Sequence, residues 1–151
     1  MLRKIMFYVM TGLIILGQGN TAVAEEFIGG LRKVKGSAYI ERKTQKIAAQ
    51  NGAKILQNDI LKTGPDGSMG VIFNDNTRIS IGPESELIVL RYLFEPDQSR
   101  FSFLGKIIKG TLSYISGSLG KFAPDSVAVE TPTTTIGIRG TRFLVKIENP
   151  E

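Results

Sequence analysis

One stretch decides the fold: Met69-Gly70-Val71-Ile72-Phe73-Asn74-Asp75-Asn76-Thr77-Arg78-Ile79-Ser80-Ile81. Apolar residues alternate on both sides of a turn-forming Asn-Asp-Asn, which is the pattern of a hairpin with one buried face. A two-residue loop would place Arg78 opposite Phe73 on the apolar face. A three-residue loop instead pairs Phe73 with Thr77 and Val71 with Ile79. Burial therefore selects the three-residue loop, with Asn76 in the left-handed conformation.

Similar short segments fill the chain on both sides of this hairpin, separated by Gly, Pro, Asn and Asp. No stretch after residue 24 keeps a 3.6-residue apolar period long enough to predict a helix with certainty. We therefore expect an all-β fold: a single domain of about ten short strands in twisted solenoid-like or sandwich-like antiparallel sheets. The expected strands are residues 34–42, 45–49, 59–62, 69–73, 77–81, 86–94, 99–104, 106–115, 126–130 and 142–147. Lys35-Gly36-Ser37 resembles Lys109-Gly110-Thr111, which hints at a weak internal repeat.

The N-terminus has the form of a secretory signal peptide. Arg3 and Lys4 precede an uncharged stretch, residues 5–16, and Ala22-Val23-Ala24 provides a small-residue exit. That stretch is shorter than the roughly 20 residues that span a bilayer, so we expect cleavage rather than retention as an anchor. The sequence thus predicts a signal peptide at residues 1–24 and an exported domain at residues 25–151. We expect the protein to be periplasmic or secreted, with no stable membrane anchor after cleavage.

The composition excludes several classes of site. The chain has no Cys, His or Trp, so disulfides, zinc held by His or Cys, and triads that need imidazole are excluded. Its 19 basic and 14 acidic residues give a net charge of +5, part of which belongs to the N-terminus. We expect no enzyme activity, no metal and no cofactor. Nucleic acid is not an expected partner either, because an exported domain whose net charge is only +3 after loss of Arg3 and Lys4 gives little reason to expect the concentrated basic face that such binding usually needs.

Three short patterns invite a catalytic or metal-binding reading, and each has a simpler one. Ser118-Leu119-Gly120-Lys121 and Lys62-Thr63-Gly64 match penicillin-binding motifs, but in reversed order, and Gly117 and Gly120 flank the serine. Glu84 and Glu86 are more simply a solvated strand end than a hydrolytic pair. Asp75 between two Asn residues forms a tight turn without calcium.

Residues 86–94 are apolar on both faces of an expected strand. Ile88, Leu90 and Phe94 are expected on the face opposite Leu87, Val89 and Leu93. Such a strand is either enclosed between two layers or pairs with another chain. We take Ile88, Leu90 and Phe94 as a candidate interaction strand, at a sheet edge or at a self-association face that would form a homo-oligomer.

The most unusual segment is residues 127–143, where a strand meets a proline and then an arginine between two glycines. The glycines would permit close backbone approach or a positive φ around the arginine. Its guanidinium could bind several carbonyl groups or one carboxylate. We favour an internal clamp that holds the last strand, over ligand binding. The residues of this candidate clamp are Thr131, Pro132, Gly137, Arg139, Gly140 and Thr141.

This segment resembles the FecR domain family. The resemblance also rests on the hairpin at residues 67–85 with its Gly82-Pro83-Glu84-Ser85 exit, and on Gly110-Thr111-Leu112. It covers about residues 34–147. It implies a non-catalytic extracytoplasmic domain of the kind that relays receptor occupancy to a sigma factor. We expect a stand-alone exported domain without the anti-sigma segment, so the sensing or interaction module remains.

Two functions follow as expectations. In the first, the domain binds a protein partner in the bacterial cell envelope, in a signalling context, by adding a strand at an exposed sheet edge. In the alternative, it is a structural or polysaccharide-binding envelope component that uses a basic N-terminal face. The residues of that face are Arg32, Lys33, Lys35, Arg42, Lys43 and Lys46.

Overall fold

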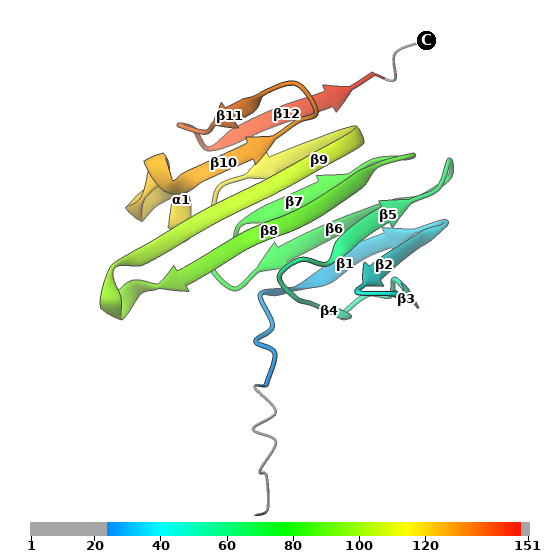
Figure 1. The fold of residues 1–151 in the computed structure, drawn as a ribbon, viewed down its shortest axis with the longest axis horizontal. Coiled ribbons are helices and arrows are strands. Elements are labelled where there is room, and N and C mark those ends of the chain that lie inside the picture. The colour runs from blue at the N-terminus through cyan, green and yellow to red at the C-terminus, as the bar shows by residue number, and fades with distance from the viewer. Residues whose placement is uncertain (1–23, 149–151) are drawn as a thin grey trace, which may run out of the picture.

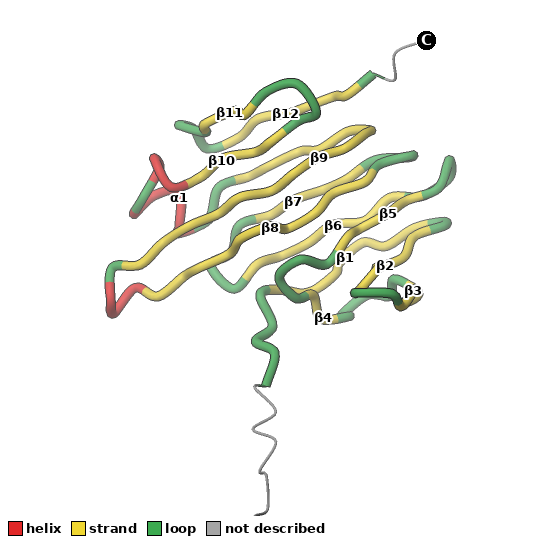
Figure 2. Tube along the Cα trace, in the orientation of Figure 1, coloured by secondary structure: helices red, strands yellow, loops and turns green. Residues whose placement is uncertain are grey.

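A computed structural model describes residues 24–148, and these residues are mainly β-strand. Figure 2 shows how little helix they contain: α1 and two short 3-10 turns. The elements, in chain order, are β1 Gly29–Lys35, β2 Ala38–Arg42, β3 Gln45–Ala48, β4 Lys54–Ile55, β5 Ile60–Thr63, β6 Ser68–Phe73, β7 Arg78–Ile81, β8 Glu86–Glu95, η1 Pro96–Gln98, β9 Arg100–Ile115, α1 Ser118–Phe122, η2 Pro124–Ser126, β10 Val127–Glu130, β11 Thr135–Gly137 and β12 Arg142–Ile147. The expected all-β single domain is confirmed, with twelve strands in place of ten.

The strands form one curled sheet that folds over itself into two layers (Figure 1). Layer A contains β4, β1, β6, β7, the end of β9 and β12. Layer B contains β3, β2, β5, β8, the start of β9, β10 and β11. Neighbouring strands are antiparallel except β10 and β9, which run parallel. The arrangement is a sandwich with a single core.

The core lies between the layers because each strand turns alternate residues inward. Layer A contributes Leu31, Val71, Phe73 and Tyr114, while layer B contributes Leu61, Leu87, Val89 and Phe103, all of them buried. The aromatic rings contact one another across the sandwich: the Phe73 and Phe103 rings meet edge to face, with centroids 5.5 Å apart. Burying a side chain of this size stabilises the fold by about 1.5–3 kcal/mol. With no disulfide to help, this burial is the main source of stability.

β9 belongs to both layers. Its first part pairs with β8 in layer B, and its last part pairs with β7 and β12 in layer A. The change of layer takes place at Gly110, whose φ is 87°. A Cβ at Gly110 would overlap Ser85, so the close approach of the two backbones requires glycine.

The other crossings between layers stack beside this one. The amide of Gly64 donates to the Ser37 carbonyl at 2.8 Å, and the amide of Glu84 donates to the Gly64 carbonyl at 3.0 Å. The Thr111 amide then donates to Ser85 Oγ at 2.9 Å. These contacts join four of the places where the chain passes between layers, at residues 36–37, 64–67, 82–85 and 110–111, and so hold this edge of the sandwich together.

Both copies of the repeated tripeptide lie at such crossings. Gly36 has a φ of 60°, and the chain turns there from β1 into β2. The prediction of one continuous strand at residues 34–42 is therefore wrong. A Cβ at Gly36 would overlap the Asp66 carbonyl, so the glycine marks a corner and not a position within a strand.

The hairpin prediction is confirmed in its details. Val71 lies opposite Ile79, and Met69 lies opposite Ile81. The Phe73 amide donates to the Thr77 carbonyl at 2.9 Å, which closes a three-residue loop. Asn76 is left-handed, with a φ of 66°.

The expected signal peptide lies at residues 1–24, of which residues 1–23 are outside the described part of the chain. Among residues 24–148, no helix is long and apolar enough to cross a membrane.

Candidate functional site

A hollow with a volume of about 560 Å³ lies at one end of the sandwich. It is formed by the segment before β1, the end of β2, the loop between β4 and β5, and one residue of β8. The residues that line it are Glu25, Glu26, Ile28, Glu41, Arg42, Lys43, Leu56, Gln57, Asn58, Asp59, Ile60 and Tyr92. We call it the end cavity.

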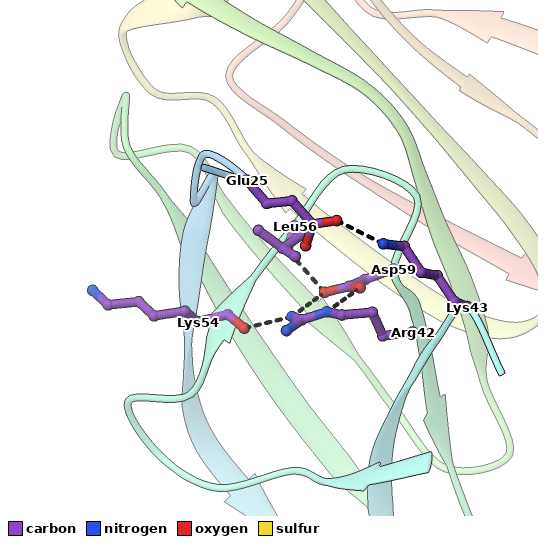
Figure 3. Close-up of polar contacts among 6 residues, drawn as sticks. All are labelled: Glu25, Arg42, Lys43, Lys54, Leu56 and Asp59. Atoms are coloured by element: carbon purple, nitrogen blue, oxygen red, sulfur yellow. Dashed lines mark hydrogen bonds and ion pairs between the residues drawn. The ribbon is translucent and has the colours of Figure 1, made fainter. Parts of the chain in front are cut away.

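An ion pair with two hydrogen bonds lies against the end cavity (Figure 3). Arg42 Nε donates to Asp59 Oδ1 at 2.8 Å, and Arg42 Nη2 donates to Asp59 Oδ2 at 2.7 Å. The Asp59 side chain is only 1% exposed and that of Arg42 is 24% exposed. The hydrogen bond to Asp59 raises the pKa of Arg42. Paired hydrogen bonds of this geometry fix the relative position of both side chains.

The same two side chains also hold the backbone around them. Asp59 Oδ2 accepts a hydrogen bond from the Leu56 amide at 2.8 Å, and Arg42 Nη2 donates to the Lys54 carbonyl at 3.0 Å. Asp59 therefore caps the loop between β4 and β5, while Arg42 ties that loop to β2. These bonds explain why a buried carboxylate is tolerated here.

The end cavity is lined mostly by polar and charged residues. Its lining contains no Ser, Thr, Cys or His, and Asp59 is already bonded to Arg42. Glu25 accepts a hydrogen bond from Lys43 at 2.8 Å, which lowers the pKa of Glu25. Within residues 24–148 no three carboxylates gather to hold a metal ion.

Behind the end cavity, Asp75 is fully enclosed and accepts four hydrogen bonds. Its Oδ1 accepts from the Tyr92 hydroxyl at 3.0 Å and from the Thr77 amide at 3.2 Å. Its Oδ2 accepts from Thr77 Oγ1 at 2.7 Å and from the Leu119 amide at 2.9 Å. This agrees with the interpretation of Asp75 as a turn residue, and it links the hairpin to β8 and α1. Burial, with the nearby charge of Asp75, raises the pKa of Tyr92.

The candidate clamp is not a buried clamp. Arg139 does bind a carboxylate, since its Nε lies 2.7 Å from Asp125 Oδ1, but their side chains are 79% and 71% exposed. A Cβ at Gly137 or Gly140 would meet nothing within 4 Å, and neither glycine has a positive φ. The expectation that these glycines allow a close approach is therefore wrong.

The remaining residues of the candidate clamp form turns. Thr131 Oγ1 accepts hydrogen bonds from the amides of Thr133 and Thr134, and Pro132 lies within this turn between β10 and β11. The Thr141 carbonyl accepts a hydrogen bond from the Ser116 amide at 2.8 Å, which begins the pairing of β12 with β9. Thr131 and Pro132 thus form the turn between β10 and β11, whereas Arg139 pairs with Asp125 and takes no part in that turn.

This C-terminal segment nevertheless forms an open groove. The groove has a volume of about 280 Å³ and lies between the ends of the two layers, where β11 closes layer B and β12 closes layer A. Figure 1 shows these two strands beside each other. The residues that line this C-terminal groove are Ile136, Gly137, Ile138, Arg139, Gly140, Arg142, Phe143, Leu144 and Val145. Leu144 is 69% exposed, which is unusual for a large apolar side chain.

β8 is not a sheet edge over its first half, because Glu86, Leu87 and Ile88 pair with β5 on one side and with β9 on the other. A β-bulge at Leu90 also shifts the alternation, so that Tyr92 and not Leu93 points into the core. Phe94 packs against the core, and its ring lies 5.8 Å from that of Phe101. The predicted common face of Ile88, Leu90 and Phe94 is therefore wrong. A role for the three in an interface stays a prediction.

The structure also places the residues of the penicillin-binding and carboxylate-pair patterns. Ser118 does begin a short helix, contrary to the expectation from its flanking glycines. Lys62 of the Lys-Thr-Gly pattern is bound to Glu41 at 2.7 Å and lies 3.8 Å from Glu86, so its charge is compensated. Glu84 is exposed at a corner of the chain.

Arg42, Asp59 and Tyr92 line the end cavity, although no sequence pattern singles them out as site residues. Arg42 was assigned to a basic face and Asp59 to the start of a strand, and they lie 17 residues apart. The turn-forming pair Asn58-Asp59 before a strand is visible in the sequence, but the burial of Asp59 is not. The predicted basic face is itself divided, since Arg42 binds Asp59, Lys43 binds Glu25, and Lys46 lies over the Tyr39 ring.

Comparison with known protein families gives a match over the C-terminal part of the chain. The family model described as FecR protein matches residues 59–151, which include β5 to β12 and the C-terminal groove. No curated protein and no solved structure matches the chain.

Proposed function

The chain belongs to the FecR family, a family of sensing and regulatory domains, and from this premise we propose that it is a non-catalytic binding module exported to the cell envelope. In this proposal the signal peptide at residues 1–24 directs the domain to the periplasm or out of the cell. Its partner is an envelope protein, and the contact is made by strand addition at the C-terminal groove.

The free edge of β12 is the observation that carries the proposal. Within the described residues, β12 pairs with β9 alone. Because the Thr141 carbonyl accepts from the Ser116 amide, the odd-numbered residues of β12 direct their backbone groups toward β9. The amides of Arg142, Leu144 and Lys146 therefore face away from the sheet. An extended segment of a partner can bond to these groups.

The side chains beside that edge favour a protein partner. The groove offers half-buried apolar surface from Ile136 and Phe143, while Leu144 is exposed beside it. Apolar pockets next to free backbone groups are what strand addition uses for specificity and affinity. An unpaired β12 edge could also pair with strands of other chains and cause aggregation. A partner bound to this edge would prevent such pairing.

Crosslinking in the intact envelope tests the proposal with two variants of one residue. Leu144→Pro removes an outward amide without breaking a bond to β9, whereas Leu144→Ala keeps the amide and shortens the side chain. We expect the adduct with a second protein to be lost in Leu144→Pro and retained in Leu144→Ala, at equal amounts of folded protein. Equal adducts from both variants, or an adduct of two copies of this chain, would contradict the proposal.

Export is tested separately. The N-terminus of the protein isolated from the envelope fraction is expected to be Glu25, which mass spectrometry determines directly. Full-length protein that remains in the cytoplasm would contradict the exported location.

A further inference from the structure

The outer face of layer A has basic side chains and no acidic ones in its strands. The segments that form this layer, which are β1, β4, β6, β7, residues 110–115 of β9, and β12, contain no Asp or Glu. Their basic residues are all exposed: Arg32, Lys33, Lys35, Lys54, Arg78, Arg142 and Lys146. The described chain thus carries a one-sided distribution of charge that its overall composition does not reveal.

The strand register places three of these residues in one row across the layer. Lys54 lies opposite Gly30, Gly30 opposite Ile72, and Ile72 opposite Arg78. The row continues from Arg78 through Ile115 to Arg142. Residues in one row project to the same side, and strands lie about 4.8 Å apart. The row from Lys54 to Arg142 therefore spans about 24 Å across the strands.

A second row runs beside the first and provides the floor of the surface. It joins Arg32 to Gly70, Ser80, Ser113 and Leu144. The small side chains leave the neighbouring guanidinium groups accessible from above, and the two hydroxyls add donors and acceptors. We call Arg32, Lys54, Arg78 and Arg142 the cationic face.

The charges of the cationic face are not compensated by the protein. None of the ion pairs among the described residues includes Arg32, Lys54, Arg78 or Arg142. Layer B is different, because Lys62 there bridges Glu41 and Glu86 on neighbouring strands. Like charges gathered on one face lower stability, so an external anion is the natural counterpart of this surface.

We infer that the cationic face binds an anionic polysaccharide, a linear chain with repeated carboxylate groups. Guanidinium groups bind carboxylates through paired hydrogen bonds, and a row of cations 24 Å long suits an extended polymer better than a small anion. Serine hydroxyls between the cations can bond to sugar hydroxyls. The cationic face borders the edge of β12 to which the protein partner is assigned, because Arg142 and Leu144 lie at the ends of the two rows and also line the C-terminal groove.

Two other anionic partners fit the surface less well. Single-stranded nucleic acid is bound by stacking on aromatic rings, and neither row of layer A has an aromatic side chain. A lipid surface is bound by apolar side chains that insert into it. Of the apolar side chains in the two rows, only Leu144 at one end is exposed, since Ile72 and Ile115 are half-buried within the sheet.

Binding to polygalacturonate, a linear polymer of uronic acid, tests the inference with charge-matched variants. The face variant is Lys54→Gln/Arg78→Gln/Arg142→Gln, and the control is Lys46→Gln/Lys106→Gln/Lys109→Gln in layer B. We expect the face variant to lose affinity by about tenfold or more, and the control to stay within about twofold of the unmodified protein. Affinity should also fall steeply with salt, while neutral dextran should not bind.

Three results would overturn the inference. Equal losses in both variants would mean that only net charge matters. Equal or tighter binding of single-stranded DNA or of vesicles containing phosphatidylglycerol would assign the face to a different partner. No binding of polygalacturonate at low salt would remove the ligand class. The double variant Lys54→Gln/Arg78→Gln, which leaves β12 unchanged, should still form the crosslinked adduct of the protein-partner proposal, so failure here and failure of that proposal can be told apart.

Discussion

Arg42 holds Asp59 through two hydrogen bonds, of 2.8 Å and 2.7 Å, across the start of the region that matches the FecR family model. Asp59 is the first matched residue, and Arg42 lies before it on β2. The first four strands are therefore not an appendage. They complete both layers and supply the cation that balances a buried carboxylate.

Removing that cation is expected to destabilise the domain strongly. Arg42→Met leaves the Asp59 carboxylate buried without its partner, which should lower the free energy of unfolding by about 3 kcal/mol. Replacing both residues, as Arg42→Met/Asp59→Leu, should cost less than Arg42→Met alone, because no buried charge remains. Urea denaturation measures both. Lys43→Gln, at the exposed neighbouring pair, is the control and should leave stability unchanged within error.

Stability is expected to fall in alkaline solution because of Tyr92. Burial raises the pKa of Tyr92, so the folded state binds its proton more tightly than the unfolded state does. This contribution is fully present below the ordinary tyrosine pKa of about 10 and is lost as the pH rises above it. Burial also raises the pKa of Tyr114, which adds in the same direction.

Tyr92→Phe separates the two effects of this hydroxyl. At neutral pH the variant should lose about 1 kcal/mol, because the hydrogen bond to Asp75 is gone. Above pH about 10 its free energy of unfolding should fall less steeply than that of the unmodified protein. Chemical denaturation at a series of pH values, with tyrosinate absorbance followed in parallel, measures this. Identical alkaline profiles for both proteins would contradict the assignment.

The crossing of β9 between layers depends on Gly110. Gly110→Ala adds a Cβ that overlaps Ser85 at a positive φ, and we expect a loss of about 2–3 kcal/mol. Gly140→Ala is the matched control, because a Cβ there meets nothing within 4 Å, and its effect should stay within about 0.5 kcal/mol. Equal effects of the two substitutions in urea denaturation would mean that the corner is not strained.

Arg139→Lys is expected to be tolerated. The pair with Asp125 is exposed to water, and such pairs contribute at most about 1 kcal/mol. The thermal midpoint of the variant should therefore lie close to that of the unmodified protein. A large drop in that midpoint would restore the internal clamp that the sequence suggested.

The features that the sequence predicted are local ones. The three-residue loop follows from the register that buries Met69 and Val71. The corners at Gly36 and Gly110 were not predicted, although both glycines lie in the similar tripeptides Lys35-Gly36-Ser37 and Lys109-Gly110-Thr111. The bulge at Leu90 could not be predicted, because an extra residue in a strand leaves no mark in an uninterrupted apolar run. Pairs such as Arg42 and Asp59 depend on how distant strands meet, and a single sequence does not encode that in any spacing.

β9 exchanges backbone hydrogen bonds with β8 on one side of the sandwich and with β7 and β12 on the other. Neither layer can separate from the other while β9 stays paired. A force applied to β12 is therefore transmitted through β9 to both layers, and it does not detach layer A alone. A partner attached to β12 would thereby be anchored to the entire domain, and slow amide exchange on both sides should share a single opening event.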